Sequence, residues 1–155
     1  MNEPDTTSPD RQRLADTRLA LPLALLRARE AVMARFRPIL ARHGINEQQW
    51  RVIRVLAEQD GLDASEVARR TAILAPSLTR MLRSMEDRGL VRRTGDPADG
   101  RRVILRIAPE GLRLIAEVSP ESLEQYRQIE TAFGTERLTA LLQLLDDLSR
   151  LDPDS

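Results

Sequence analysis

Two arginines end the stretch GDPADGRR, residues 95 to 102, and their type and spacing could do chemistry. A guanidinium is planar and permanently charged, and its parallel N–H groups match the geometry of phosphates and carboxylates. The Asp, Pro and Gly before the pair are residues of a β-turn. An ordinary surface turn explains the stretch taken alone, so its meaning depends on the neighbouring segments.

A helix with more arginines precedes this turn. The segment AILAPSLTRMLRSMEDRGL, residues 72 to 90, predicts a helix with Pro76 in its first turn, and Gly89 as its left-handed C-cap with Leu90 as the hydrophobic latch. At about 100° per residue, one face is apolar; it holds Leu78, Met81, Leu82 and Met85. The outer face is basic and bears hydroxyls; it holds Pro76, Ser77, Arg80, Arg83, Ser84 and Asp87, with Thr79 at its edge.

The charge is unevenly distributed, although the net charge of the chain is zero. Between Arg69 and Arg106 there are ten arginines and four acids, so this segment carries +6 and the rest of the chain −6. All 24 basic residues are arginine, which the codon bias of a GC-rich genome explains as readily as a need for bidentate phosphate binding. The middle of the chain is a basic module between acidic flanks.

The composition excludes several classes of chemistry. With no cysteine and one histidine, the chain has no disulfide framework, no Cys/His zinc site and no thiol nucleophile. A nucleophile, a base and an orienting group do not occur together, so we expect no enzyme, no metal and no cofactor. The apolar stretch at residues 19 to 26 contains a proline and is too short to span a bilayer, and no signal-peptide pattern opens the chain. We therefore expect a cytoplasmic protein with no membrane partner.

The N-terminal part predicts a tail and one long helix. Residues 1 to 12 are polar and contain two prolines, as in a flexible tail. A helical pattern runs from about Leu14 to His43, Gly44 stops it, and Pro22 should break or kink it near its start.

Two further helices follow before most of the basic module. Asn46 is a good N-cap for a helix over residues 47 to 59. Asp63 followed by Glu66 resembles a capping box that opens a short helix over residues 64 to 71.

The turn lies between two strand patterns. Residues 90 to 94 and 101 to 107 flank it, and in the second run Val103, Leu105 and Ile107 alternate with the residues between them. These runs predict a two-stranded hairpin.

Helical patterns fill the C-terminal part, at residues 110 to 133 and 136 to 151. Pro120 should kink or divide the first of these helices, with Ser119 capping the resumed part.

A helix, a basic helix and an arginine-tipped hairpin in this order indicate a winged helix-turn-helix, a mainly α fold with a small β-hairpin wing. Terminal segments rich in leucine would expose large apolar faces in a monomer, so we expect a homodimer formed by the N- and C-terminal helices. The expected domains are a flexible tail at 1–12, an N-terminal dimerisation helix at 13–44, a DNA-binding domain at 45–108 and C-terminal dimerisation helices at 109–151.

This arrangement suits double-stranded DNA. A helix fits the major groove, where Arg80 and Arg83 could each bond a guanine or hold a phosphate and Ser77 could donate to either. A hairpin tip can place Arg101 in the minor groove, while Arg102 meets phosphate. Each arginine alone could be a solvated surface charge, but their combination favours DNA. Two-fold symmetry then predicts a pseudo-palindromic operator.

The stretch GLVRRTGDPADGRRVILRIAPEG, residues 89 to 111, resembles the MarR family of transcriptional regulators, and the resemblance spans residues 14 to 150. It implies that Arg101 reaches into the minor groove and that Asp99 orients a wing arginine through an ion pair. Ala108 replaces a helix-capping Thr of the family, and Gly100 replaces a polar residue of many relatives, so this wing should grip less tightly. The candidate DNA contacts are Pro76, Ser77, Thr79, Arg80, Arg83, Ser84, Asp99, Arg101 and Arg102.

Residues 21 to 58 resemble a subgroup of that family that represses homoprotocatechuate (4-hydroxyphenylacetate) degradation operons, which implies a small phenolic or aromatic acid as effector. Arg29 lies on an apolar stripe with Met33 and Phe36 and needs an anion, which a ligand carboxylate or an Asp or Glu of either subunit would supply. Trp50 could stack on an aromatic ring or pack in the core.

Three functions follow as hypotheses. The first is a repressor whose DNA affinity responds to such an acid. The others are a DNA binder without an effector and a winged-helix module that acts through protein contacts.

Overall fold

The computed structural model describes Asp16 and residues 20–151. The tail predicted at 1–12 and the helix start predicted near Leu14 lie outside the described residues. The chain divides into two compact units between Pro38 and Ile39.

The first unit contains most of α2, Leu21–Arg42. The helix begins at Leu21 and Ala20 is not helical, which agrees with the predicted break near Pro22. Pro22 lies in the first turn, where a helix needs no backbone N–H from the residue. Leu21, Leu25 and Leu26 on this helix are exposed.

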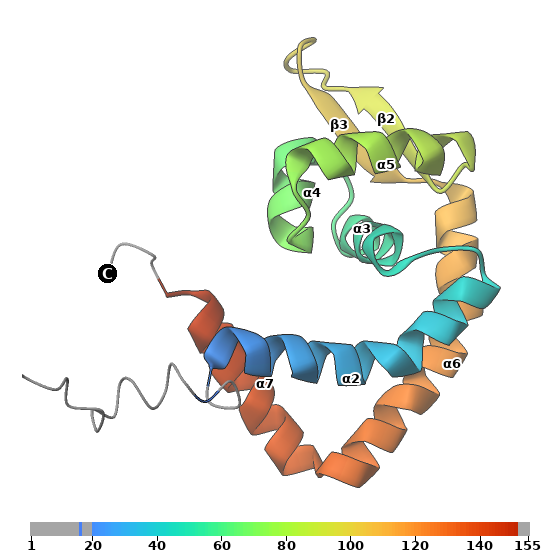
Figure 1. The fold of residues 1–155 in the computed structure, drawn as a ribbon. Coiled ribbons are helices and arrows are strands. Elements are labelled where there is room, and N and C mark those ends of the chain that lie inside the picture. Colours follow the sequence, from blue (N-terminus) through green and yellow to red (C-terminus); the bar gives the residue numbers. More distant parts are fainter. Residues whose placement is uncertain (1–15, 17–19, 152–155) are drawn as a thin grey trace, which may run out of the picture. The chain divides into compact units, whose positions relative to one another are not determined.

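Three helices follow in the second unit: α3 (Glu47–Glu58), α4 (Ala64–Thr71) and α5 (Ala75–Asp87). Figure 1 shows α4 and α5 side by side, with α3 beneath them. The predicted caps of α3 and α4 are confirmed, because Asn46 Oδ1 accepts the Gln49 N–H at 2.9 Å and Asp63 Oδ1 accepts the Glu66 N–H at 2.8 Å. The box at α4 is half formed, because the Glu66 carboxylate binds Arg69 and Arg70 instead of the Asp63 N–H.

The end of α5 has the predicted geometry. Gly89 has a φ of 67°, and its N–H donates to the Glu86 carbonyl at 2.9 Å. The Leu90 N–H donates to the Met85 carbonyl at 2.9 Å, and the Leu90 side chain is buried. This left-handed end turns the chain from α5 into the sheet.

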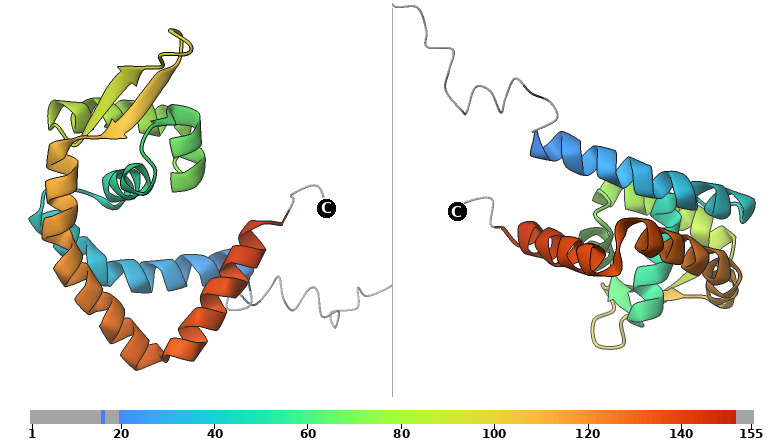
Figure 2. Two further views of the ribbon diagram at one scale, coloured as in Figure 1. Left: turned by 180° about the vertical axis from the view of Figure 1, so that it is seen from behind. Right: turned by 90° about the horizontal axis from the view of Figure 1, so that it is seen from below.

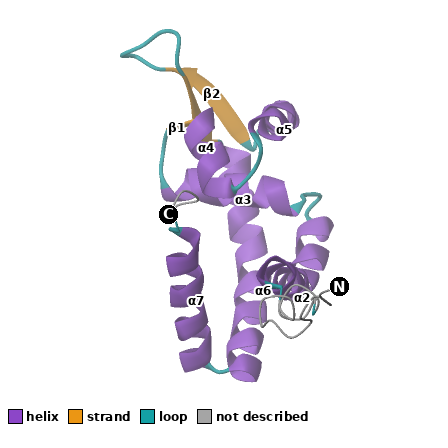
Figure 3. Ribbon diagram, turned by 60° about the vertical axis from the view of Figure 1, so that its left-hand side comes forward, coloured by secondary structure: helices purple, strands orange, loops and turns teal. Residues whose placement is uncertain are grey.

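The sheet has three antiparallel strands in the order β1-β3-β2, formed by Leu62–Asp63, Val103–Ile107 and Val91–Gly95. The prediction of a two-stranded hairpin is therefore incomplete, because β1 pairs Leu62 with Leu105. The hairpin of β2 and β3 projects away from the helices (Figures 2 and 3). Val103 is exposed although it belongs to the predicted apolar alternation, because it lies beyond the pairing with β1.

The core of the second unit lies between α3, α4, α5, the sheet and the start of α6. Its largest fully buried side chains include those of Ile53, Leu56, Leu78, Met85 and Leu105. Helix α4 and strand β2 thus hold the inner face of α5, which leaves the outer face of that helix towards solvent.

Two long helices close the chain, α6 (Pro109–Phe133) and α7 (Thr135–Ser149), joined at Gly134. Of the two predicted effects of Pro120, division of α6 is wrong, because the helix is continuous, and a kink stays a prediction. Pro120 and Ala116 are both exposed, so the carbonyl of Ala116 that the proline leaves without an N–H can bond to water. Ser119 does not cap a second helix, because its hydroxyl donates to the Ile115 carbonyl at 2.6 Å.

Candidate nucleic-acid interface

The buried and the exposed face of α5 hold the residues that the sequence predicts for them. Leu78, Leu82 and Met85 are buried and Met81 packs against them from a half-buried position. The outer face is open to solvent: Ser77 is half-buried, and the exposed residues are Pro76, Thr79, Arg80, Arg83, Ser84 and Asp87. A helix fixed on one side in this way can present the other side to a groove.

Several arginines near α5 and the sheet are bound to acids of the same unit. Their pairs are Arg69 and Arg70 with Glu66, Arg93 with Glu86, Arg102 with Asp63, and Arg106 with Asp60. The pair of Arg93 with Glu86 connects β2 to α5, and those of Arg102 and Arg106 connect the wing and β3 to residues 60–63. These arginines are therefore engaged within the unit before any partner binds.

Other arginines have no such partner. In the part of the chain that the structure describes, the side chains of Arg80, Arg83, Arg92 and Arg101 form no ion pair or hydrogen bond. An unpaired guanidinium is available to a phosphate or a base without first breaking an internal bond. Arg92 on β2 was not among the residues predicted from the sequence, because alternation alone does not tell a paired strand arginine from a free one.

The hydroxyl groups of α5 also include one that is hydrogen-bonded within the chain and two that have no such bond to the part of the chain that the structure describes. Thr79 Oγ1 donates to the Ala75 carbonyl at 3.0 Å, so its proton is already used within the helix. Ser77 and Ser84 form no side-chain hydrogen bond within the described residues. Ser77 is therefore the freer donor near the start of α5.

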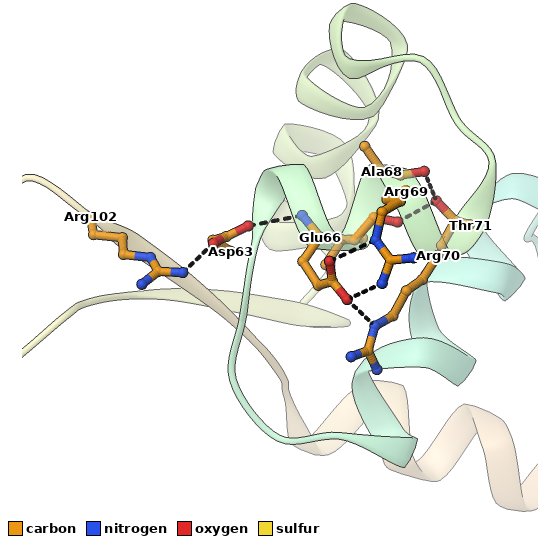
Figure 4. A network of polar contacts seen from close by, with 8 residues as sticks. Asp63, Glu66, Ala68, Arg69, Arg70, Thr71 and Arg102 are labelled. Carbon is orange, nitrogen blue, oxygen red and sulfur yellow. Dashed lines mark hydrogen bonds and ion pairs between the residues drawn. The ribbon is translucent and has the colours of Figure 1, made fainter. Parts of the chain in front are cut away.

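Asp63 connects Arg102 to the start of α4 in the polar network that Figure 4 draws. Its carboxylate accepts the backbone N–H of Glu66 and pairs with Arg102, and both contacts lower the pKa of Asp63 below its ordinary value. The same pair raises the pKa of the Arg102 guanidinium. Arg69 and Arg70 bind the Glu66 carboxylate and lower its pKa to about 2. Both acids are therefore charged at neutral pH and hold the arginines in place.

The wing loop is folded by two aspartates. Asp96 Oδ1 accepts the Ala98 N–H at 2.9 Å, and Asp99 Oδ1 accepts the Arg101 N–H at 3.0 Å. The prediction that Asp99 orients a wing arginine through an ion pair is not met, because Arg102 pairs with Asp63. Asp99 instead fixes the backbone of the wing loop through its hydrogen bond from the Arg101 N–H.

The glycines contribute less to this turn than the sequence suggested. Gly95 is the last residue of β2 and pairs with Val103, and neither Gly95 nor Gly100 has a positive φ. A side chain at Gly100 would meet no other atom within 4 Å, so this position has room for a polar residue.

A polar hollow of about 640 Å³ lies between α5 and β2. Thr79, Arg80, Arg83, Glu86 and Arg93 line it. Arg93 Nε lies 2.8 Å from Glu86 Oε2, so one arginine of the hollow is neutralised while Arg80 and Arg83 remain available. The hollow is therefore positive and open.

The two candidate ligand residues lie in different units. Arg29, on α2 in the first unit, is exposed and its Nη1 lies 2.9 Å from Glu30 Oε1. Trp50, on α3 in the second unit, is half-buried and packs against the core. For each residue the sequence left open an alternative to ligand binding. Arg29 shows the contact of that alternative, a bond to an acid of the chain, and Trp50 shows core packing.

The described residues contain no cluster of three or more His, Asp or Glu side chains that could hold a metal. His43 stands at the end of α2 with its Nδ1 at 3.5 Å from Glu117 Oε2. Within the same residues, no helix has both the length and the apolar character needed to cross a membrane.

Comparisons with known proteins agree with this geometry. The MarR family model matches residues 43–102. The homoprotocatechuate degradative operon repressor of Escherichia coli is 43% identical over 132 residues, which cover 85% of this chain and 89% of that protein. The chain therefore belongs to the MarR family of transcriptional regulators.

Solved structures share its fold. The crystal structure of NadR in complex with 4-hydroxyphenylacetate is 42% identical, with a TM-score of 0.78 over 86% of this chain and 94% of NadR. The repressor CouR bound to a 23-mer DNA duplex is 28% identical, with a TM-score of 0.79 over 88% of this chain and 97% of CouR. The predicted fold class, a mainly helical winged helix-turn-helix, is confirmed.

Proposed function

We propose that this protein is a dimeric transcriptional repressor that binds a pseudo-palindromic DNA operator and whose DNA affinity is changed by a small aromatic acid such as a hydroxyphenylacetate. The observation that carries the DNA-binding part is the set of unpaired cations: Arg80 and Arg83 on the outer face of α5, and Arg101 at the wing tip. A partner with regularly spaced negative charges matches this set.

The predicted contacts divide between the two grooves. Residues of α5 enter the major groove, with Arg80 and Arg83 on bases or phosphates and Ser77 as a donor, supported by Pro76, Thr79 and Ser84 at the same surface. Arg101 enters the minor groove, Asp99 holds its backbone, and Arg102 reaches phosphate after leaving Asp63.

The dimer is formed by the terminal helices, at 13–44 and 109–151, on either side of the DNA-binding domain at 45–108. Support comes from the leucines that α7 leaves exposed, among them Leu141, Leu142, Leu144 and Leu145. No residue of α7 is buried within the single chain, so the helix has no apolar contact sufficient to stabilise it unless a second copy covers it.

An aromatic acid is the effector class that the relatives support, since NadR was crystallised with 4-hydroxyphenylacetate. Arg29 is the candidate partner for the carboxylate of such an acid, which would take the place of Glu30. Trp50 is a separate candidate for stacking on an aromatic ring. The protein performs no reaction on the acid and uses no cofactor. Because its target is DNA, it acts in the cytoplasm. A ligand that favours one spacing of the two DNA-binding domains would change DNA affinity by its differential affinity for the two states.

The test is a binding titration of the full chain with duplex DNA from beside its own gene, repeated with 4-hydroxyphenylacetate and other phenolic acids present. A scrambled duplex is the control. We expect a preference for the natural duplex that the acid reduces. A preference unchanged by every acid would leave a DNA binder without an effector, and no preference at all would favour the second candidate, a winged-helix module acting through protein contacts.

A further inference from the structure

Leu74 stands at an unusual position for a leucine. It is the residue before α5, and its side chain is 78% exposed, more than any other large hydrophobic residue of the described chain. Ile73 before it is buried, whereas Ala75 and Pro76 after it are also exposed. The beginning of α5 therefore presents an apolar surface to solvent, ahead of its hydroxyls and arginines.

Folding does not account for this leucine. Leu74 is the N-cap of α5, with an extended backbone, and its side chain cannot accept an N–H of the first turn. Ser, Thr, Asp or Asn at an N-cap stabilises a helix by such a bond. The two preceding helices do use such residues, Asn46 and Asp63. The side chain of Leu74 is therefore neither buried in the core nor able to cap the helix.

A contact in the DNA groove would use the exposed leucine. Side chains near the beginning of a recognition helix meet base edges in the major groove. Thymine is the base that shows an apolar group there, its C5-methyl, and apolar side chains contact it. Ser77 and the unpaired Arg80 follow within the next two turns of α5, so polar partners for the neighbouring groups are at hand.

We propose that Leu74 reads a thymine in each half of the operator, by apolar contact with its C5-methyl group. This inference rests on the proposed DNA-binding function and adds a base identity to it. Arg80 and Arg83 supply charge and hydrogen bonds, while Leu74 selects an A·T pair at one position.

The test begins with selection of binding sites from a pool of random DNA duplexes, using the full chain. Each thymine of the selected site is then replaced singly by uracil, which keeps base pairing and removes only the methyl group. These duplexes are titrated with the natural protein, with Leu74→Ala and with Arg54→Ala. Arg54 is the control, since it is an exposed residue of α3 that pairs with Glu58 and lies outside the dimerisation helices and the candidate DNA contacts.

We expect one uracil position per half-site to weaken binding by the natural protein about fourfold, the value for loss of one buried methyl group. Leu74→Ala should lose this difference between thymine and uracil, and Arg54→Ala should keep it. If a site is selected but no uracil effect depends on Leu74, the inference is wrong while the proposed function stands. If the natural protein selects no site, the proposed function is wrong and the inference falls with it.

Discussion

Asp63 and Arg102 form an ion pair between residues 39 apart in the sequence. The same carboxylate caps α4 by accepting the Glu66 N–H at 2.8 Å. One side chain therefore fixes the start of α4 and the point where the wing returns to the sheet. Because α4 packs against α5, the wing and α5 are positioned by a common contact.

Asp63→Ala should destabilise the protein by about 1 kcal/mol, the typical cost of losing an N-cap. The ion pair adds little to this loss because Arg102 is more than half exposed. Chemical denaturation followed by circular dichroism measures the difference. Asp63→Ser is the control: it restores the cap but not the pair, so most of the stability should return. Equal losses in both variants would mean that the ion pair, not the cap, is the larger contribution.

The pH dependence of stability should report on Glu66. Hydrogen bonds from Arg69 and then Arg70 lower the pKa of Glu66 from 4.5 to about 2. Because the folded carboxyl has the lower pKa, its stabilisation is complete above pH 4.5 and is lost as the pH falls to about 2. The difference in unfolding free energy between the natural protein and Glu66→Gln should therefore shrink over this range. A constant difference down to about pH 2 would contradict this assignment of the pKa.

Local signals predicted the helices well. Asn46, Asp63 and Gly89 act on backbone groups within a few residues, so the limits of α3, α4 and α5 follow from the sequence. The strand β1 was missed because two residues show no alternation. The sequence left open whether Pro120 kinks or divides α6, because it does not reveal that the freed carbonyl faces solvent.

The sequence predicted which face of α5 each residue of the candidate site occupies, but it did not predict which arginines form ion pairs. Periodicity distinguished the outer residues of α5 from the buried ones. It could not reveal that Arg102 pairs with Asp63, or that Arg106 pairs with Asp60 across 46 residues. Such pairs depend on the folded arrangement of strands and helices, which also decides that Arg92 is free and Arg93 is bound.

Gly111 should not tolerate a larger residue. A Cβ at this position of α6 would lie 2.3 Å from the Leu90 carbonyl oxygen and 2.9 Å from Ile107 Cγ1. Alanine normally favours a helix over glycine by about 1 kcal/mol, but overpacking costs about 1–3 kcal/mol, and the Leu90 oxygen belongs to backbone that cannot move freely. We expect Gly111→Ala to unfold at a lower denaturant concentration. Leu112→Ala, at the next and exposed position, should change stability little, and a stabilised Gly111→Ala would disprove the close contact.

The two arginines of the wing should differ in their effect on DNA binding. Arg101→Ala removes an unpaired cation and should weaken operator binding about tenfold or more, in the range expected for one specific arginine contact. Arg102→Ala should cost less, because Arg102 must leave Asp63 before it can bind phosphate. Titration at several salt concentrations measures both. Arg54→Ala is the control, since this arginine of α3 pairs with Glu58, and an equal loss in that variant would mean that the effect is general charge.

Leu74→Ser separates stability from recognition at the start of α5. Serine can accept an N–H of the first turn, which the leucine cannot, and the backbone at this position is already extended as an N-cap requires. The substitution should therefore raise the free energy of unfolding by about 1 kcal/mol, measured by chemical denaturation. The same variant should bind its selected DNA less selectively, because it lacks the apolar contact with thymine. A loss of stability in Leu74→Ser would show that the leucine serves the fold, and the reason for assigning it to DNA would disappear.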